Sequence, residues 1–409
     1  MHTMLDKKIE SFRREAVEFQ RGLTERPAVP PNMGGTGEAE KAEFLKEWFR
    51  TRGISQIEQF DAPDDRVTGG TRPNLIVTLP GKNANKNIWI ISHMDIVPPG
   101  ERSAWTHDPY SLIEEGDILY GRGVEDNQHG IVSSALALLA LHELKITPAC
   151  NLKLLFAADE ESGSDLGAKY LLSKYPDLFG PRDEFIIPDH GSPDGMDIQI
   201  AEKSIYVLKF TTEGKQCHAA DPHSGNNAFT AASALVVALS SLSDRFSYMS
   251  DERFLPPFST FVPTKKEQNV NATNVVPGED RFFMDCRLLP QLDFEEAAET
   301  IDEIKSMVER EYNVKINWDI HACKSSSHTP DSAPVVTKLR EAVRKVRGGE
   351  TRLVGIGGGT IAGDFRQIGR EAVVWSTCLN TAHMPDEHCS IRDLLDDARV
   401  FCVFSLMEK

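Results

Sequence analysis

The chain has 409 residues, of which 40% are hydrophobic, and 62 acidic against 45 basic residues give it a formal net charge of −17. This length predicts two domains, or one domain with a large insertion, and the charge argues against a nucleic-acid partner because no basic patch offsets it. No apolar run approaches the roughly 20 residues that span a bilayer, the first residues carry no signal-peptide centre, and the seven cysteines form no CxxC pair, so we expect a cytoplasmic protein with reduced thiols.

Helical and strand-like segments alternate in the first half of the chain. Apolar residues at helical spacing predict helices over 5–22 and 38–52, and the Ala- and Leu-rich segment 131–144 predicts another. Short apolar runs predict buried strands at 74–79, 87–92, 152–157 and 185–188. Such alternation favours an α/β fold with a mostly parallel sheet that helices cover on both faces.

The pattern changes near residue 204. Segments 205–211, 226–243, 270–276, 281–288, 294–312 and 314–321 read as strand, helix, strand, strand, helix and strand. This order is the split βαβ, ferredoxin-like arrangement. After a polar return linker, 324–332, helix and strand signals resume at 334–346, 372–377 and 391–407. The sequence therefore predicts a discontinuous α/β domain, 1–203 and 324–409, interrupted by an α+β lid domain, 204–323, of typical domain size.

Candidate metal ligands follow the predicted strands or open the long helix. They are His93, Asp126, the adjacent Glu160 and Glu161, Asp189 and His383. Ligands bind beyond the carboxyl ends of parallel strands, so we expect these side chains to meet in one crevice. Each has a plain structural alternative, such as a surface histidine, a helix cap or a turn residue. Their shared placement at strand ends favours the metal site.

Two imidazoles and three carboxylates could hold two divalent ions if one carboxylate bridges them. Paired ions of this kind suit the hydrolysis of amides and phosphates. A further carboxylate must then take a proton from water and deliver it to the leaving group. The pair Glu160-Glu161 offers this division of labour, with one residue as ligand and the other as base.

Several motifs together resemble the dinuclear zinc hydrolases that include aminoacylase, carnosinase, glutamate carboxypeptidase, acetylornithine deacetylase and succinyl-diaminopimelate desuccinylase. The motifs are Ser92-His93-Met94-Asp95-Ile96-Val97-Pro98, Trp105 with Asp108-Pro109, Tyr120-Gly121-Arg122-Gly123-Val124-Glu125-Asp126-Asn127, Asp159-Glu160-Glu161-Ser162-Gly163, Pro188-Asp189 and Ala382-His383-Met384-Pro385-Asp386-Glu387. The resemblance runs through nearly the whole chain. It makes the discontinuous domain the catalytic, metal-binding one and the inserted domain a lid that also forms a homodimer.

The resemblance implies a role for each candidate. It assigns His93 and Asp189 to one metal, Glu161 and His383 to the other, Asp126 to both, Glu160 to the general base and Asp95 to orienting the His93 ring. A cis peptide is implied at Asp126-Asn127. The expected reaction is hydrolysis of an amide bond in a small peptide or N-acyl amino acid by a metal-bridging water. The two ions are expected to be zinc, with cobalt or manganese as alternatives.

The lid carries further candidates by the same resemblance. His218 would stabilise the oxyanion, often from the partner subunit, and Asn274 also fits the pattern. Arg287 would clamp a substrate carboxylate, its plain alternative being a salt-bridged strand residue. Gly358 and Gly359 would line a substrate loop, and a phosphate loop is disfavoured because the expected lysine is absent.

Two departures from the family pattern weaken any transfer of substrate identity. Gln128-His129-Gly130 stands where the family usually has Lys-Gly, and the glycine usual before the first strand of the lid is replaced in Ala201-Glu202-Lys203-Ser204. The alternatives to a peptidase or deacylase are an amidohydrolase of carbamoyl or ureido groups and a non-catalytic binding protein of the same fold. No nucleic acid or membrane is expected as a partner.

Overall fold

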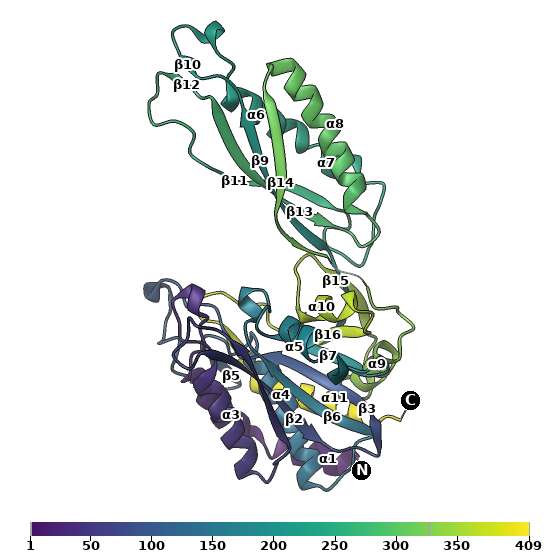
Figure 1. Cartoon of the computed structure of the whole chain (residues 1–409). Helices are drawn as coiled ribbons and strands as arrows, with labels where there is room; N and C mark the ends of the chain where they lie inside the picture. The colour runs from purple at the N-terminus through teal and green to yellow at the C-terminus, as the bar shows by residue number, and fades with distance from the viewer. Residues whose placement is uncertain (1, 326–327, 409) are drawn as a thin grey trace. The chain divides into compact units, whose positions relative to one another are not determined.

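The computed structural model describes residues 2–325 and 328–408, so two residues of the predicted return linker, 326 and 327, lie outside the description. The chain divides into two compact units (Figure 1). Unit 1 comprises Met1–Ile200, Thr329–Leu353 and Thr360–Lys409. Unit 2 comprises Ala201–His328 and Val354–Gly359.

An eight-stranded sheet of order β1-β2-β6-β3-β7-β16-β8-β15 forms the centre of unit 1. The strands are β1 Ile57–Pro63, β2 Thr71–Leu79, β3 Asn83–His93, β6 Cys150–Ala157, β7 Glu184–Ser192, β8 Asp197–Glu202, β15 Arg352–Ile356 and β16 Ala372–Thr377. β6, β3, β7 and β16 run parallel, whereas β1 pairs antiparallel with β2, β2 with β6, and β8 with β16. The predicted α/β class with a parallel sheet is confirmed for these central strands.

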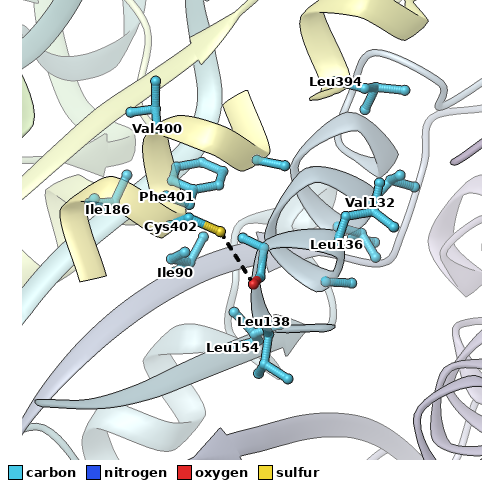
Figure 2. Close-up of a cluster of buried hydrophobic side chains, with 14 of the residues drawn as sticks. Ile90, Val132, Leu136, Leu138, Leu154, Ile186, Leu394, Val400, Phe401 and Cys402 are labelled. Carbon is cyan, nitrogen blue, oxygen red and sulfur yellow. Dashed lines mark hydrogen bonds between the residues drawn. The ribbon is translucent and has the colours of Figure 1, made fainter. Parts of the chain in front are cut away.

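Helices cover both faces of this sheet because alternate side chains of a strand point to opposite faces. On one face lie α1 His2–Glu10, α2 Arg13–Thr24, α3 Ala39–Thr51, α4 Gln128–Glu143, α9 Pro334–Arg347 and α11 Ile391–Leu406. Figure 2 shows α4 and α11 packed over Ile90, Leu154 and Ile186 of the sheet. Trp89 and Phe185, next to these residues in sequence, point to the other face, where α5 Ala168–Lys174 and α10 Ile361–Gln367 lie.

The helix expected over 5–22 is two helices, because the chain leaves helical geometry between Glu10 and Arg13. A smaller sheet of unit 1 has the order β17-β5-β4, with β4 Ile113–Glu115, β5 Ile118–Tyr120 and β17 His388–Ser390. None of the helices in the described part of the chain combines the length and the apolar character that a membrane span requires.

Unit 2 contains a four-stranded antiparallel sheet of order β11-β13-β9-β14. Its elements are β9 Ser204–Glu213, α6 Ala228–Leu239, α7 Leu242–Arg245, β11 Thr260–Lys266, β13 Glu279–Leu288, α8 Phe294–Tyr312 and β14 Lys315–Lys324. Helices α6, α7 and α8 pack with the sheet in one apolar core. The β-α-β-β-α-β order is the predicted split βαβ arrangement.

The position predicted for the second strand of unit 2 was wrong. This strand is β11, Thr260–Lys266, and within 270–276 only Val275–Val276 is extended, as β12. β12 pairs with the short strand β10, Cys217–His218. The segment before it is rich in asparagine, a residue that favours turns by hydrogen bonding to nearby backbone, as Asn269 does to the Val270 amide.

Candidate dinuclear metal site

The predicted ligands converge at the carboxyl end of the parallel strands of unit 1. His93 ends β3, Glu161 lies in the 3₁₀ turn Glu160–Ser162 after β6, and Asp189 lies within β7. Asp126 comes two residues before α4, and His383 belongs to the segment between β16 and β17. A crevice beyond strand ends is where open α/β sheets bind ligands.

The side chains form two groups that share one carboxylate. His93 Nε2 lies 2.9 Å from Asp126 Oδ1 and 3.2 Å from Asp189 Oδ1. His383 Nε2 lies 3.0 Å from Asp126 Oδ2 and 3.2 Å from Glu161 Oε1. In each group of three, the possible ligand atoms lie within 4.8 Å of one another. The residues therefore fit two cations bridged by Asp126, with the nitrogen and oxygen donors that zinc and several other divalent ions accept.

The electrostatics of the site also fit bound cations. Burial lowers the pKa of His93, but hydrogen bonds to carboxylates, Asp126 first, outweigh it and hold this pKa well above its usual value. Hydrogen bonds to Asp126 and Glu161 raise the pKa of His383 to about 10. Burial and neighbouring carboxylates raise the pKa of Glu160. The carboxylates thus stabilise the protonated forms of the two histidines and of Glu160. Bound cations would neutralise the same excess of negative charge.

Asp95 contacts both the first histidine and the glutamate pair. His93 Nδ1 lies 3.0 Å from the Asp95 carbonyl oxygen and 3.5 Å from its Oδ1. The two carboxylate oxygens of Asp95 accept hydrogen bonds from the amides of Glu160, at 3.1 Å, and Glu161, at 3.0 Å. A ring that donates from Nδ1 to a carbonyl leaves Nε2 free for a metal. The fully buried Asp95 carboxylate therefore holds the backbone of the Glu160 turn, a contact that the sequence did not predict.

Backbone geometry at the site is unusual in several places. The peptide bond Asp126-Asn127 is cis, as the family resemblance implies. His383 and Asp159 have positive φ angles of 64° and 65°, in the left-handed region that non-glycine residues rarely adopt. The register between β7 and β16 shifts opposite the segment that contains Asp189. Positive φ angles and shifts of register of this kind re-aim side chains at functional sites.

One contact of the site comes from a residue to which sequence reasoning gave no role. Asn127 Nδ2 donates to Asp189 Oδ1 at 3.0 Å and to the Pro188 carbonyl at 2.5 Å. This amide orients one carboxylate of the first group. Its position immediately after Asp126 was the only signal in the sequence.

The remaining predicted residues lie in unit 2. His218, in β10, accepts a hydrogen bond at Nδ1 from the Ala220 amide at 3.0 Å, which leaves Nε2 as the donor of a neutral ring. The Ala219 amide donates to the Asn274 carbonyl, so Asn274 lies beside β10. Gly358 and Gly359 belong to Val354–Gly359 of this unit.

Arg287, in β13, forms an ion pair with a strand neighbour, the alternative to a role in binding a substrate carboxylate. Its guanidinium donates to both carboxylate oxygens of Asp285, at 2.7 and 3.0 Å, and to the Gly357 carbonyl at 2.9 Å. Among the residues that the structure describes, these contacts engage three of its five N–H donors.

An α/β fold with two groups of metal-binding side chains around one shared carboxylate is that of a metal-dependent hydrolase. Residues 89–406 match Peptidase family M20/M25/M40, and the chain belongs to this family. It is 37% identical to an uncharacterized metallohydrolase of Methanocaldococcus jannaschii over 402 residues, which are 95% of this chain and 98% of that protein.

Another relative and a solved structure are also similar to this chain. The chain is 28% identical to a succinyl-diaminopimelate desuccinylase of Gluconobacter oxydans, over 96% of this chain and 97% of that protein. The crystal structure of the aminopeptidase PepT from Bacillus cereus shares the fold with a TM-score of 0.77 at 21% identity, covering 96% of this chain and 98% of that one. The protein is therefore a metallohydrolase of this dinuclear, metal-dependent family.

Proposed function

We propose that the protein hydrolyses the C–N amide bond of a small peptide or N-acyl amino acid that has a free carboxylate. One observation carries the proposal: two groups of ligand atoms share Asp126, while Glu160 stands next to the ligand Glu161 without belonging to either group. This arrangement matches the division between metal ligands and a proton-transferring carboxylate that amide hydrolysis needs.

In this proposal His93 and Asp189 would hold one divalent ion, Glu161 and His383 would hold the other, and Asp126 would contribute to both groups. Bound together, two such ions polarise a carbonyl oxygen and acidify a water molecule. Glu160 takes up the proton and passes it to the leaving amine. Its position supports this role, because the half-buried Glu160 lies directly beside the proposed ligand Glu161 and belongs to neither group of ligand atoms. Asp95 holds the amide of Glu160 and so fixes where the base stands.

We also propose that residues of unit 2 bind the substrate. His218 would donate from Nε2 to the developing oxyanion, Arg287 would use its remaining donors for a carboxylate, and Asn274, Gly358 and Gly359 would contact substrate. These roles remain predictions of the family resemblance, and the hydrogen bond that sets the His218 tautomer supports the first of them.

We further propose zinc as the metal and a homodimer formed through unit 2. Large apolar side chains support the dimer, since Phe229 and Val237 of α6 and Val262 of the edge strand β11 are 45%, 73% and 50% exposed. A cytoplasmic location remains a prediction of the sequence.

A substrate panel tests the proposal. The full chain would be loaded with zinc, cobalt or manganese and assayed on dipeptides, N-acyl amino acids and ureido acids. Turnover of a dipeptide or acyl amino acid, abolished by a chelator and restored by metal, is the expected result. Turnover confined to ureido or carbamoyl substrates would replace the proposal with the non-peptide alternative, and no turnover on any class would overturn it.

A further inference from the structure

The segment that carries His383 lies between β16 and β17 and is exposed at the site. The His383 side chain is 54% exposed, and its backbone φ of 64° is one of three positive values in this segment, with Asn380 and Asp386. A non-glycine residue holds such a conformation only where its surroundings enforce it. Something other than burial must therefore position this ligand.

Glu125, the residue before the shared ligand Asp126, binds the backbone ahead of His383. Its Oε1 accepts from the Leu379 amide, and its Oε2 accepts from the Thr381 amide at 2.5 Å and from Thr381 Oγ1 at 2.8 Å. The Glu125 side chain is thus a buried acceptor for the start of the His383 segment.

Glu387, four residues after His383, makes the converse contact, because its side chain binds the backbone around Asp126. Its Oε1 accepts from the amides of Glu125, at 2.9 Å, and Asp126, at 3.0 Å. Its Oε2 accepts from the Gly123 amide at 3.0 Å and from Arg122 Nη1 at 2.6 Å. This glutamate is fully buried. Each segment therefore sends one carboxylate to the backbone of the other.

We propose that Glu125 and Glu387 form a reciprocal clamp that fixes Asp126 against His383 and thereby sets the affinity of the Asp126–Glu161–His383 group for its metal ion. Both are positioning residues, because neither belongs to the two groups of possible ligand atoms and both act through the backbone of the segments that carry Asp126 and His383. The clamp rests on the proposed function, which assigns these three residues to one ion.

The expected effect follows from the chemistry of the acceptors. Hydrogen bonds from amides to a carboxylate are charge-assisted. A buried carboxylate is fully satisfied only when both of its oxygens accept hydrogen bonds. Replacement by glutamine keeps the shape but turns one oxygen into an NH₂ group that faces other N–H donors. Residues that orient metal ligands typically contribute 10- to 100-fold to metal affinity. We expect a loss of this size for Glu125→Gln and for Glu387→Gln.

A matched control separates this effect from general destabilisation. Asp183, at the opposite end of β7, is also a buried carboxylate with several donors, namely the Asn87 amide and side chain, Trp89 Nε1 and the Gly180 amide. It contacts none of the proposed ligands among the described residues. Asp183→Asn should lower the melting temperature without changing the affinity of the folded protein for metal.

The experiment is a titration of the full metal-free chain with Co²⁺, followed by calorimetry and by the cobalt absorption bands, well below the melting temperature of every variant. We expect one of the two binding steps to weaken 10- to 100-fold in both glutamine variants, with altered cobalt bands, while Asp183→Asn binds as wild type does. Thr381→Val removes the hydroxyl contact to Glu125 together with the contacts of this hydroxyl to the carbonyl and amide of His388, and leaves the amide contacts of the clamp in place, so it should weaken the same step less.

Four results would overturn the clamp. Unchanged affinities in the glutamine variants would refute it, and so would an equal loss in Asp183→Asn. Should a glutamine variant fail to fold, Thr381→Val decides, since unchanged binding there would also refute the clamp. Wild-type protein that binds no cobalt would overturn the metal site of the proposed function and the clamp with it, whereas normal wild-type binding isolates the clamp as the failing idea.

Discussion

Replacing Glu160 with glutamine isolates its proposed role as the base. Among the residues that the structure describes, the Glu160 carboxylate makes no hydrogen bond, and its backbone amide is held by Asp95. The amide side chain has the same size, so the turn and the neighbouring ligand Glu161 should keep their positions. The substitution therefore removes a proton acceptor and little else.

The size of the effect follows from the loss of general base catalysis. Such a group contributes about 100- to 10,000-fold, which corresponds to about 3 to 5 kcal/mol in the barrier. We expect Glu160→Gln to lose that much kcat on the best substrate of the panel while it retains both metal ions by elemental analysis. Glu161→Gln, one residue further on, removes a proposed ligand and the contact to His383, so it should lose metal as well.

The comparison of these two neighbours can refute the reasoning. Near-normal turnover in Glu160→Gln would exclude it as the base. Loss of metal in Glu160→Gln but not in Glu161→Gln would mean that the roles of the two residues are exchanged.

Three further predictions test other parts of the site and the assembly. Asp95→Asn, which can satisfy only one of the two amides it now binds, should weaken metal binding 10- to 100-fold in a cobalt titration, and wild-type affinity would contradict its positioning role. His218→Ala should lower kcat about 100- to 1000-fold with unchanged metal content, and an unaltered kcat would remove His218 from the mechanism. Val237→Glu places a charge on an exposed apolar position of α6 and should shift the protein from dimer to monomer in light scattering, whereas an unchanged mass would argue against an interface there.

The central strands and the ligand positions could be predicted because they depend on local patterns. Buried parallel strands read as short apolar runs, as Leu152 to Ala157 do, and a polar residue that follows such a run must lie at the same edge of the sheet as the others. Strand β15, Arg352–Ile356, lacks that signal, since it is short and only Gly355 in it is buried. No periodicity could separate it from a loop.

The contacts that hold the ligands in place could not be predicted from the sequence. Asp95 was expected to orient the His93 ring, which it contacts, and its carboxylate oxygens also accept from two backbone amides that no pattern indicated. Glu125 and Glu387 stood in recognisable motifs and received no role, because their partners are also backbone amides. A side-chain pattern records which residues are present, whereas the direction of an N–H group depends on local φ and ψ angles that only the structure supplies.

The departures from the family pattern show where this chain differs without changing its ligands. Gln128 accepts hydrogen bonds from Gln20 and Thr24 of α2. His129 pairs with the buried Asp397 of α11 at 2.8 Å. Both side chains therefore point into the helix layer of unit 1, away from the Asp126 carboxylate. These two residues thus anchor α4 to α2 and α11, and this departure leaves the inference of metal ligands from the motifs intact.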